Sequence, residues 1–138
     1  MPTIRQFEDI QAWKDAMALA GAVYSASRDG LFVKDFGLQD QMRRAAISIS
    51  SNIAEGFERD STPEFIRFLA IAKGSSGELR SQLYLARQQG YVSAEMFESL
   101  RSMSLEVSRK IARLSAYLRN NASTRPPQAR SHSAPAAH

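Results

Sequence analysis

Four segments of the 138-residue chain repeat apolar side chains at alternating steps of three and four residues. This spacing gathers the apolar residues on one side of an α-helix, and a helix with one apolar side buries it against a neighbour. No segment alternates with the period of two that a half-buried β-strand requires. Short connections favour helices that fold back on their neighbours, so the pattern predicts an all-α fold, an antiparallel up-and-down four-helix bundle.

The predicted helices span residues 9–28, 37–59, 62–88 and 93–121, and together they make residues 1–121 one domain. The residues expected to face the core are Ile10, Trp13, Met17, Ala20 and Tyr24 in the first helix; Leu38, Met42, Ala45, Ile49, Asn52 and Gly56 in the second; Phe65, Leu69, Ala72, Ser76, Leu79, Leu83 and Ala86 in the third; and Phe97, Leu100, Ser104, Val107, Ile111, Leu114 and Leu118 in the fourth.

The clearest helix boundary is Ser61-Thr62-Pro63-Glu64, which combines a capping hydroxyl, a proline in the first turn and a glutamate placed to reach back. Glycine readily takes the left-handed conformation that ends a helix. The remaining boundaries are expected at Glu8 or Asp9 (start of the first helix), Gly30 (its end), Gly90 (end of the third) and Ser93 (cap of the fourth).

Composition restricts the setting of this bundle. The chain has no cysteine, which excludes disulfides and thiolate metal sites and favours a reducing cytoplasm. Its N-terminus lacks the apolar stretch of a signal peptide, and no segment is apolar enough to span a membrane, so we expect no membrane partner. Residues 122–138 are rich in Pro, Ala and Ser without an apolar period, and we expect this tail to be disordered.

Several polar residues are expected to meet across the second and third helices. Folding these helices about the turn at 60–62 brings three pairs level, and the first would be an interhelical ion pair. The pairs are Arg44 with Glu78, Ser48 with Gly74, and Glu55 with Arg67. Close approach of the third-helix backbone to Ser48 and Asn52 would explain the mid-helix run Gly74-Ser75-Ser76-Gly77, and a ligand notch is the alternative.

The folded part lacks the residues that most catalytic sites of helical proteins use. The two histidines of the chain, His132 and His138, both lie in the tail, so the folded part has neither a Glu-x-x-His di-iron site nor an Arg–His ribonuclease site. Acidic pairs such as Glu55 with Glu58 lack neighbours that would perturb them and are more typical of solvated charge. No phosphate-binding glycine loop follows a strand. We expect no enzyme activity, no cofactor and no metal.

Basic residues recur on the third and fourth helices. The formal net charge is +4, but Arg125 and Arg130 lie in the tail, so only +2 remains for the folded part. The candidates for phosphate contact are Lys73, Arg80, Arg87, Arg109, Lys110 and Arg113. Such a surface would contact phosphates without reading sequence. The alternative is a solvated face with pairs inside a helix, such as Glu106 with Lys110, and the sequence favours neither.

A second candidate surface is apolar. Phe32, Val33 and Phe36 crowd the first connection, and Phe68 and Tyr84 lie beside the expected core positions of the third helix. Exposed aromatic residues suit a subunit interface, although some of these would complete the core.

Three stretches resemble the four-helix bundle protein family, first noted as products of intervening sequences in bacterial 23S ribosomal RNA genes. They are residues 7–24 with Trp13-Lys14-x-Ala16, residues 41–56 (QMRRAAISISSNIAEG), and residues 64–79 (EFIRFLAIAKGSSGEL). Ser50 departs from the pattern, because family members often carry proline there. The resemblance implies a bundle that assembles into a ring, a homopentamer, without enzyme activity. A protein related in fold, the accessory variability protein of diversity-generating retroelements, binds nucleic acid and a reverse transcriptase.

These observations together predict a non-enzymatic, cytoplasmic, homo-oligomeric accessory protein whose basic helix faces contact RNA, DNA or a ribonucleoprotein partner. The alternative is a structural or protein-scaffolding oligomer whose partner is another protein and whose charge serves solubility.

Overall fold

The computed structural model describes residues 3–121 and contains four α-helices. They are α1 (Gln11–Ala26), α2 (Phe36–Glu58), α3 (Thr62–Gln88) and α4 (Ala94–Asn121), with short 3-10 turns η1 (Phe7–Asp9) and η2 (Gly30–Lys34). No strand occurs in this range, so the predicted all-α, four-helix fold is confirmed. The prediction of a disordered tail at 122–138 lies outside the described residues.

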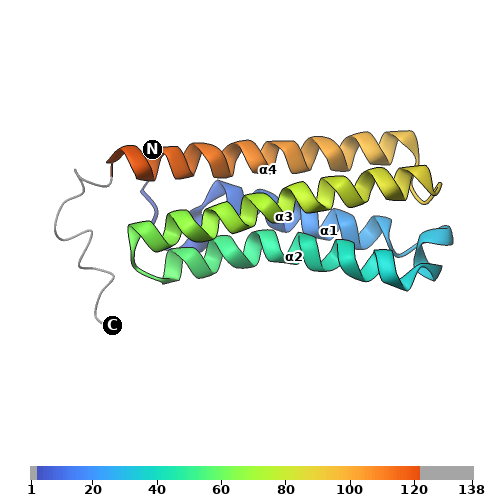
Figure 1. Cartoon of the computed structure of the whole chain (residues 1–138), viewed down its shortest axis with the longest axis horizontal. Coiled ribbons are helices and arrows are strands. Elements are labelled where there is room, and N and C mark those ends of the chain that lie inside the picture. Colours follow the sequence, from blue (N-terminus) through green and yellow to red (C-terminus); the bar gives the residue numbers. More distant parts are fainter. Residues whose placement is uncertain (1–2, 122–138) are drawn as a thin grey trace.

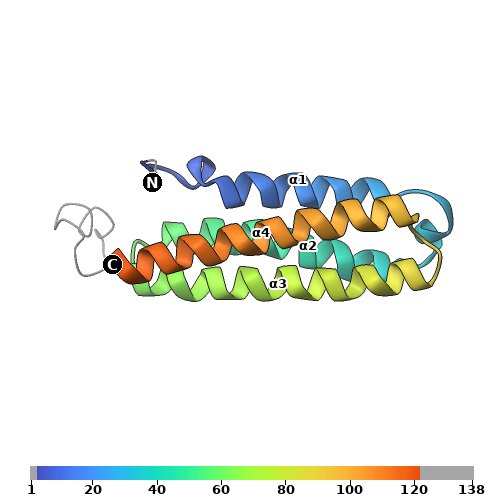
Figure 2. The ribbon, with the colours of Figure 1, turned by 90° about the horizontal axis from the view of Figure 1, so that it is seen from above.

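The four helices lie side by side along one long axis (Figure 1). The α2–α3 connection is at one end, and the α1–α2 and α3–α4 connections are at the other. Helix α2 packs against α1 and α3, and α4 packs against α3 and α1. Figure 2 shows α1 and α3 on opposite sides of the molecule, which is the square arrangement that these contacts require.

The core forms where the apolar stripes of the four helices meet. All seven predicted positions of α3, from Phe65 to Ala86, are buried, as are six of the seven in α4. Ile49, Leu79 and Ile111 are at most 2% exposed and lie at mid-length in three different helices. Burial of one such side chain contributes about 1.5–3 kcal/mol, so this interior accounts for much of the stability.

The predicted core stripe of the first helix is right for Ile10 and Ala20, which are buried, and wrong for the other positions. Met17 is 47% exposed, and the buried residues of this helix are Ala12, Ala16, Leu19, Ala20 and Val23. The prediction favoured large residues, whereas α1 turns a row of alanines inward. Trp13 packs edge-on against Phe7, and Tyr24 lies under the Arg43 guanidinium, so both aromatic rings cover the rim of the core.

Local signals set most helix ends. The Ser61 hydroxyl accepts a hydrogen bond from the Glu64 amide (3.3 Å), and Ser93 does the same for Met96 (3.0 Å), as predicted. Gly90 takes a positive φ angle of 77° two residues after the end of α3, as predicted. The expected end of the first helix at Gly30 is wrong, because α1 ends at Ala26 and Gly30 (φ 62°) begins η2. The expected start at Glu8 or Asp9 is wrong: Asp9 caps η1 by accepting from the amides of residues 5 and 6, and α1 begins at Gln11.

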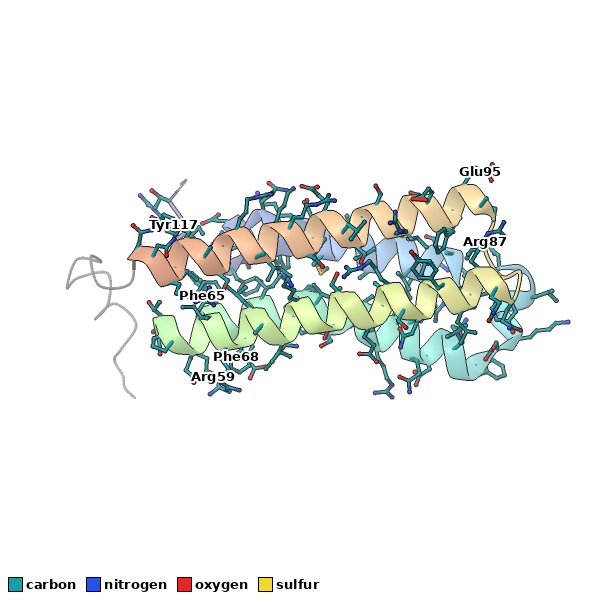
Figure 3. The ribbon with its side chains drawn as sticks, turned by 45° about the horizontal axis from the view of Figure 1, so that its top comes forward. Arg59, Phe65, Phe68, Arg87, Glu95 and Tyr117 are labelled. Carbon is teal, nitrogen blue, oxygen red and sulfur yellow. The ribbon has the colours of Figure 1, made fainter. Side chains whose placement is uncertain are left out.

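Among the glycines of the described helices, Gly56 and not Gly74 is the one that a neighbouring helix approaches most closely. A Cβ built on Gly56 would lie 2.5 Å from the Phe68 Cβ, whereas one on Gly74 would meet nothing within 4 Å. The expected explanation of the mid-helix glycines by close approach of Ser48 and Asn52 is therefore wrong for Gly74. Gly56 lets the start of α3 cross the end of α2 with Phe68 buried between them; Figure 3 shows Phe68 beside Arg59 at this end.

We predict that Gly56→Ala destabilises the fold by about 1–3 kcal/mol, because the new methyl group collides with α3. The matched control is Gly74→Ala, which adds the same methyl group to an exposed helix position. It should be neutral or stabilise by up to about 1 kcal/mol. Urea unfolding followed by circular dichroism measures both, and equal effects of the two changes would contradict this account of the packing.

Candidate functional site

The interhelical ion pairs expected between α2 and α3 do not form. Arg44 pairs with Asp40 of its own helix (2.8 Å), and Glu78 accepts a hydrogen bond from Gln82. Likewise, Glu55 pairs with Arg59 and Arg67 with Glu64, both at 3.0 Å. The physical reason is proximity, because partners three or four residues apart on one helix meet with less loss of side-chain entropy than partners on two helices.

The neutral part of the predicted network does join α2 to α3. The hydroxyl groups of Ser48 and Ser75 lie 2.8 Å apart, and the Asn52 amide donates to the Ser48 hydroxyl (2.9 Å). The sequence-based register placed Ser48 level with Gly74, one residue away. These contacts are polar links in the α2–α3 interface and hold no titratable group.

The three basic candidates on α4 each form an ion pair with a carboxylate. Lys110 forms an ion pair with Asp15 of α1, with both side chains about three-quarters buried. Arg109 and Arg113 share Glu106, at 3.3 Å and 3.7 Å, on the outer side of α4. The sequence pattern suggested one wall with the α3 residues, but α4 presents these three side chains to α1 and to solvent. The expected pair of Glu106 with Lys110 is replaced by these contacts.

The three candidates on α3 have no carboxylate partner within residues 3–121. Lys73 is exposed. Arg87 donates to the Val92 carbonyl (3.4 Å) across the α3–α4 connection, and Figure 3 shows it at that end of α3. Arg80 lies between these two, half-buried against α4.

Arg80 is held by serine hydroxyls of both helices. Its Nη1 lies 3.2 Å from the Ser76 Oγ, 2.9 Å from the Ser104 Oγ and 2.9 Å from the Ser108 Oγ. The Ser76 hydroxyl also donates to the Ser104 carbonyl (3.0 Å). The three serines are at most 7% exposed, so they form a buried polar layer in an otherwise apolar interface.

Sequence reasoning missed this layer as a unit. Ser76 and Ser104 were assigned to the core stripes of their helices, and Ser108 was not singled out. The sequence did hold a signal for it. Ser76 and Ser104 occupy core positions of two facing helices, and Arg80 follows Ser76 by one helical turn.

A fourth cation extends the same side of the molecule. The Arg101 Nε donates to the Tyr84 hydroxyl (3.2 Å), and its Nη1 pairs with Glu98 (3.1 Å). Tyr84 is 54% exposed and packs edge-on against Phe97. We call the set Lys73, Arg80, Tyr84 and Arg87 of α3 with Arg101, Ser104 and Ser108 of α4 the α3–α4 seam.

The apolar candidates divide into core and surface. Phe32 is fully buried and stacks on Tyr91, and Phe68 is 6% exposed, so both complete the core. Val33 and Phe36 remain exposed beside Leu31 at the α1–α2 connection. A shallow open depression there is lined by Leu31, Lys34, Asp35, Phe36, Gly37 and Tyr91.

Asp35 orders this end of the bundle. Its carboxylate accepts from the Leu38 amide (3.0 Å), which caps α2, and from the Tyr91 hydroxyl (2.9 Å). The hydrogen bond from the Leu38 amide and then that from Tyr91 lower the pKa of Asp35 below its usual value. Asp35 therefore stays ionised and ties the start of α2 to the α3–α4 connection.

Two other kinds of feature are absent from residues 3–121. No group of three or more His, Asp or Glu side chains is placed to hold a metal ion. No helix in this range is long and apolar enough to cross a bilayer.

The fold and the seam define a four-helix bundle protein. The family model of the 23S rRNA-intervening sequence protein matches residues 8–113, so the chain belongs to that family. Among solved structures, it is similar to a protein with unknown function from the S23 ribosomal protein family of Bacteroides thetaiotaomicron VPI-5482. The TM-score is 0.71 at 24% identity over 76% of this chain and 95% of that one, a likeness of fold. No curated protein matches the chain.

We predict that Asp15→Asn lowers stability at neutral pH by about 1 kcal/mol, because it leaves Lys110 partly buried without its partner. Burial raises the pKa of Asp15, but hydrogen bonds from Lys110 and Gln11 and the Lys110 charge outweigh it, so the pKa is lowered. The stabilisation is thus complete above the ordinary carboxyl pKa and is lost as pH falls through the lower folded-state value.

Chemical denaturation of wild type and Asp15→Asn between neutral and acidic pH measures this effect. The two stability curves should converge as the pH falls. Asp40→Asn, which breaks an exposed pair with Arg44, is the control and should shift stability by a few tenths of a kcal/mol at most. A gap between wild type and Asp15→Asn that persists in acid would overturn the assignment.

Proposed function

We propose that this chain is a non-enzymatic, homo-oligomeric accessory protein whose α3–α4 seam binds the phosphates of RNA. One observation carries the proposal: the seam brings together Lys73, Arg80, Arg87 and Arg101, and the one carboxylate that pairs with any of them within residues 3–121 is Glu98. Cations without local partners gain most from phosphates, because binding releases the counterions condensed on the nucleic acid.

The proposal narrows the set of contact residues. Arg109, Lys110 and Arg113 already pair with carboxylates, so a phosphate would have to compete with Glu106 or Asp15. We therefore assign them a secondary role. Arg101 is added to the set because its Nε donates to the hydroxyl of the exposed Tyr84, which places it on the seam; like the α4 residues just named, it also pairs with a carboxylate, that of Glu98.

Tyr84 supports binding to unpaired nucleotides. An exposed aromatic ring among cations can stack on a base, which is sequence-tolerant and works for single strands. RNA is the first nucleic acid to test and single-stranded DNA the second. A ribonucleoprotein partner would use the same contacts.

The proposal includes an antiparallel order of the four helices and assembly into a ring, a homopentamer, in the cytoplasm. Support for assembly comes from the exposed apolar residues Leu31 (63%), Val33 (37%) and Phe36 (74%) at one end of the bundle. Apolar side chains that stand together on a surface are typical of subunit contacts. A ring would also repeat the α3–α4 seam around its circumference.

The alternative function is a structural or protein-scaffolding oligomer. The same apolar end favours it, because Phe36 would then dock another protein while the cations only keep the chain soluble. Under this alternative, removal of seam cations changes no binding event.

We predict that wild type binds a short fluorescein-labelled oligouridine with an affinity that falls steeply with salt. The combined change Lys73→Gln and Arg101→Gln should weaken binding and reduce the slope of log K against log salt by about 0.7 for each phosphate that is no longer neutralised. The control, Arg109→Gln with Arg113→Gln, removes the same charge from the outer side of α4 and should reduce the slope less. Fluorescence anisotropy measures both.

Equal effects of the two double variants would contradict the seam and indicate a diffuse charge effect. Absence of binding by wild type at low salt, for RNA and single-stranded DNA alike, would favour the scaffold.

We also predict that the protein has about five times its chain mass of 15.3 kDa in multi-angle light scattering. Val33→Asp with Phe36→Asp should lower that mass, because burying two carboxylates in an apolar contact is unfavourable. Met17→Asp, at a comparably exposed position of α1, is the control and should leave the mass unchanged. A monomeric wild type would refute the ring, and an unchanged mass in the double variant would place the contact elsewhere.

A further inference from the structure

We propose that Arg80 is a built binding site for one phosphate group. The site consists of its guanidinium, the three buried serines Ser76, Ser104 and Ser108, and the opening left by Gly77. It lies at mid-length of the α3–α4 seam. The identity of the ligand as an RNA phosphodiester rests on the proposed function. The contacts of the site themselves would suit any phosphate group.

The guanidinium of Arg80 is held in place through one nitrogen, Nη1. Its Nη1 lies within 3.2 Å of all three serine Oγ atoms, which belong to both α3 and α4. The serines are also bonded to one another, since the Ser108 hydroxyl donates to Ser76 (2.9 Å). A side chain held from two helices loses little further conformational freedom when it binds a ligand.

The rest of the guanidinium has no partner within residues 3–121. The hydrogen bonds of Arg80 all use Nη1, and no carboxylate of this range lies within 4.0 Å of it. Nε and Nη2 therefore keep three N–H donors beside each other. This edge of a guanidinium matches two oxygens of a phosphate, with two parallel charge-assisted hydrogen bonds.

Gly77 leaves this edge open. A Cβ at Gly77 would lie 3.8 Å from the Nη2 of Arg80, in ordinary van der Waals contact, so glycine keeps this side of the guanidinium free of a neighbouring side chain. Glycine in the middle of a helix lowers helix stability relative to alanine. No contact of the described chain requires glycine at this position, and open access to Nη2 is the role that the proposed site gives it.

A purely structural role explains less of this arrangement. Three hydroxyls suffice to hydrogen-bond one another and the Ser104 carbonyl, without an arginine. An arginine that only filled the interface would leave a half-buried positive charge with no anion, which is unfavourable. A bound phosphate supplies the missing anion.

Two variants separate binding from folding. Arg80→Lys keeps the charge but cannot form two parallel bonds, and it identifies the Arg80 Nε–H signal in a nitrogen-15 NMR spectrum by its loss. Ser108→Ala keeps Arg80 and removes one of the hydroxyls that orient it. Ser102→Ala, at an exposed position of the same helix, is the matched control. Circular dichroism and urea unfolding confirm that each variant is folded.

The first measurement is a titration of the full chain with inorganic phosphate, against chloride at equal ionic strength. We expect the Arg80 Nε–H signal to shift with phosphate in a saturable way and to remain in place with chloride. Ser108→Ala should weaken this binding by about tenfold, the typical effect of one hydrogen bond to a charged group, and Ser102→Ala should not change it. A signal that responds equally to both salts overturns the site.

The second measurement separates the two sources of phosphate. If the source is RNA, oligouridine without a terminal phosphate shifts the Arg80 signal, and Arg80→Lys weakens the binding of oligouridine by about tenfold. If inorganic phosphate shifts the signal while wild type fails to bind oligouridine, the phosphate site stands and the RNA function falls. If oligouridine binds with no change at Arg80 and with undiminished affinity in Arg80→Lys, the RNA function stands and this inference is overturned.

Discussion

The burial of one side of α3 between α2 and α4 is the constraint on which the rest of this structure depends. Helix α3 contributes the longest run of buried positions and packs against both neighbours. Its crossing with α2 is fixed at one end by Gly56, where the absence of a Cβ lets Phe68 enter. Once that crossing is set, the register of the whole interface follows, and it brings the hydroxyls of Ser48 and Ser75 together halfway along.

The other side of α3 has a different character. An apolar side chain in place of Ser76 or Ser104 would suit a simple helix contact, and the serines instead form a polar layer that contains a guanidinium. Buried polar groups stabilise a fold only when their hydrogen bonds are satisfied. Here the serines are satisfied and the arginine is satisfied in part, so the layer fixes the register of α4 on α3 and leaves a positive charge at the surface.

The apolar period predicted the helices well because burial is the strongest signal that a sequence carries. The ends of α3 and the cap at Ser93 followed from residues whose backbone preferences are local. The stripe of α1 failed in part because size was used as a guide to burial: Met17 is exposed, whereas the small residues Ala12 and Ala16 are buried. Pairs across helices failed for a related reason. Register alone placed Arg44 level with Glu78 but could not weigh Asp40, which lies on the same helix and is easier to reach.

The three α3 cations of the seam, though not Arg101 of α4, could have been distinguished from the other basic residues by the same rule. Arg44, Arg59, Arg67, Arg101 and Arg109 each have an acidic residue three or four positions away on their own helix, and each pairs with it. Lys73, Arg80 and Arg87 have only Leu, Ala, Ser, Gly or Tyr at those positions. Because a helix brings such neighbours together, a cation with no acid at that spacing is left for another helix or for a ligand. Helix α4 presents serines, not carboxylates, to Arg80. These positive charges of α3 thus have no acidic partner on their own helix, and α4 supplies none to Arg80. A phosphate-binding surface requires positive charge that is free in this way.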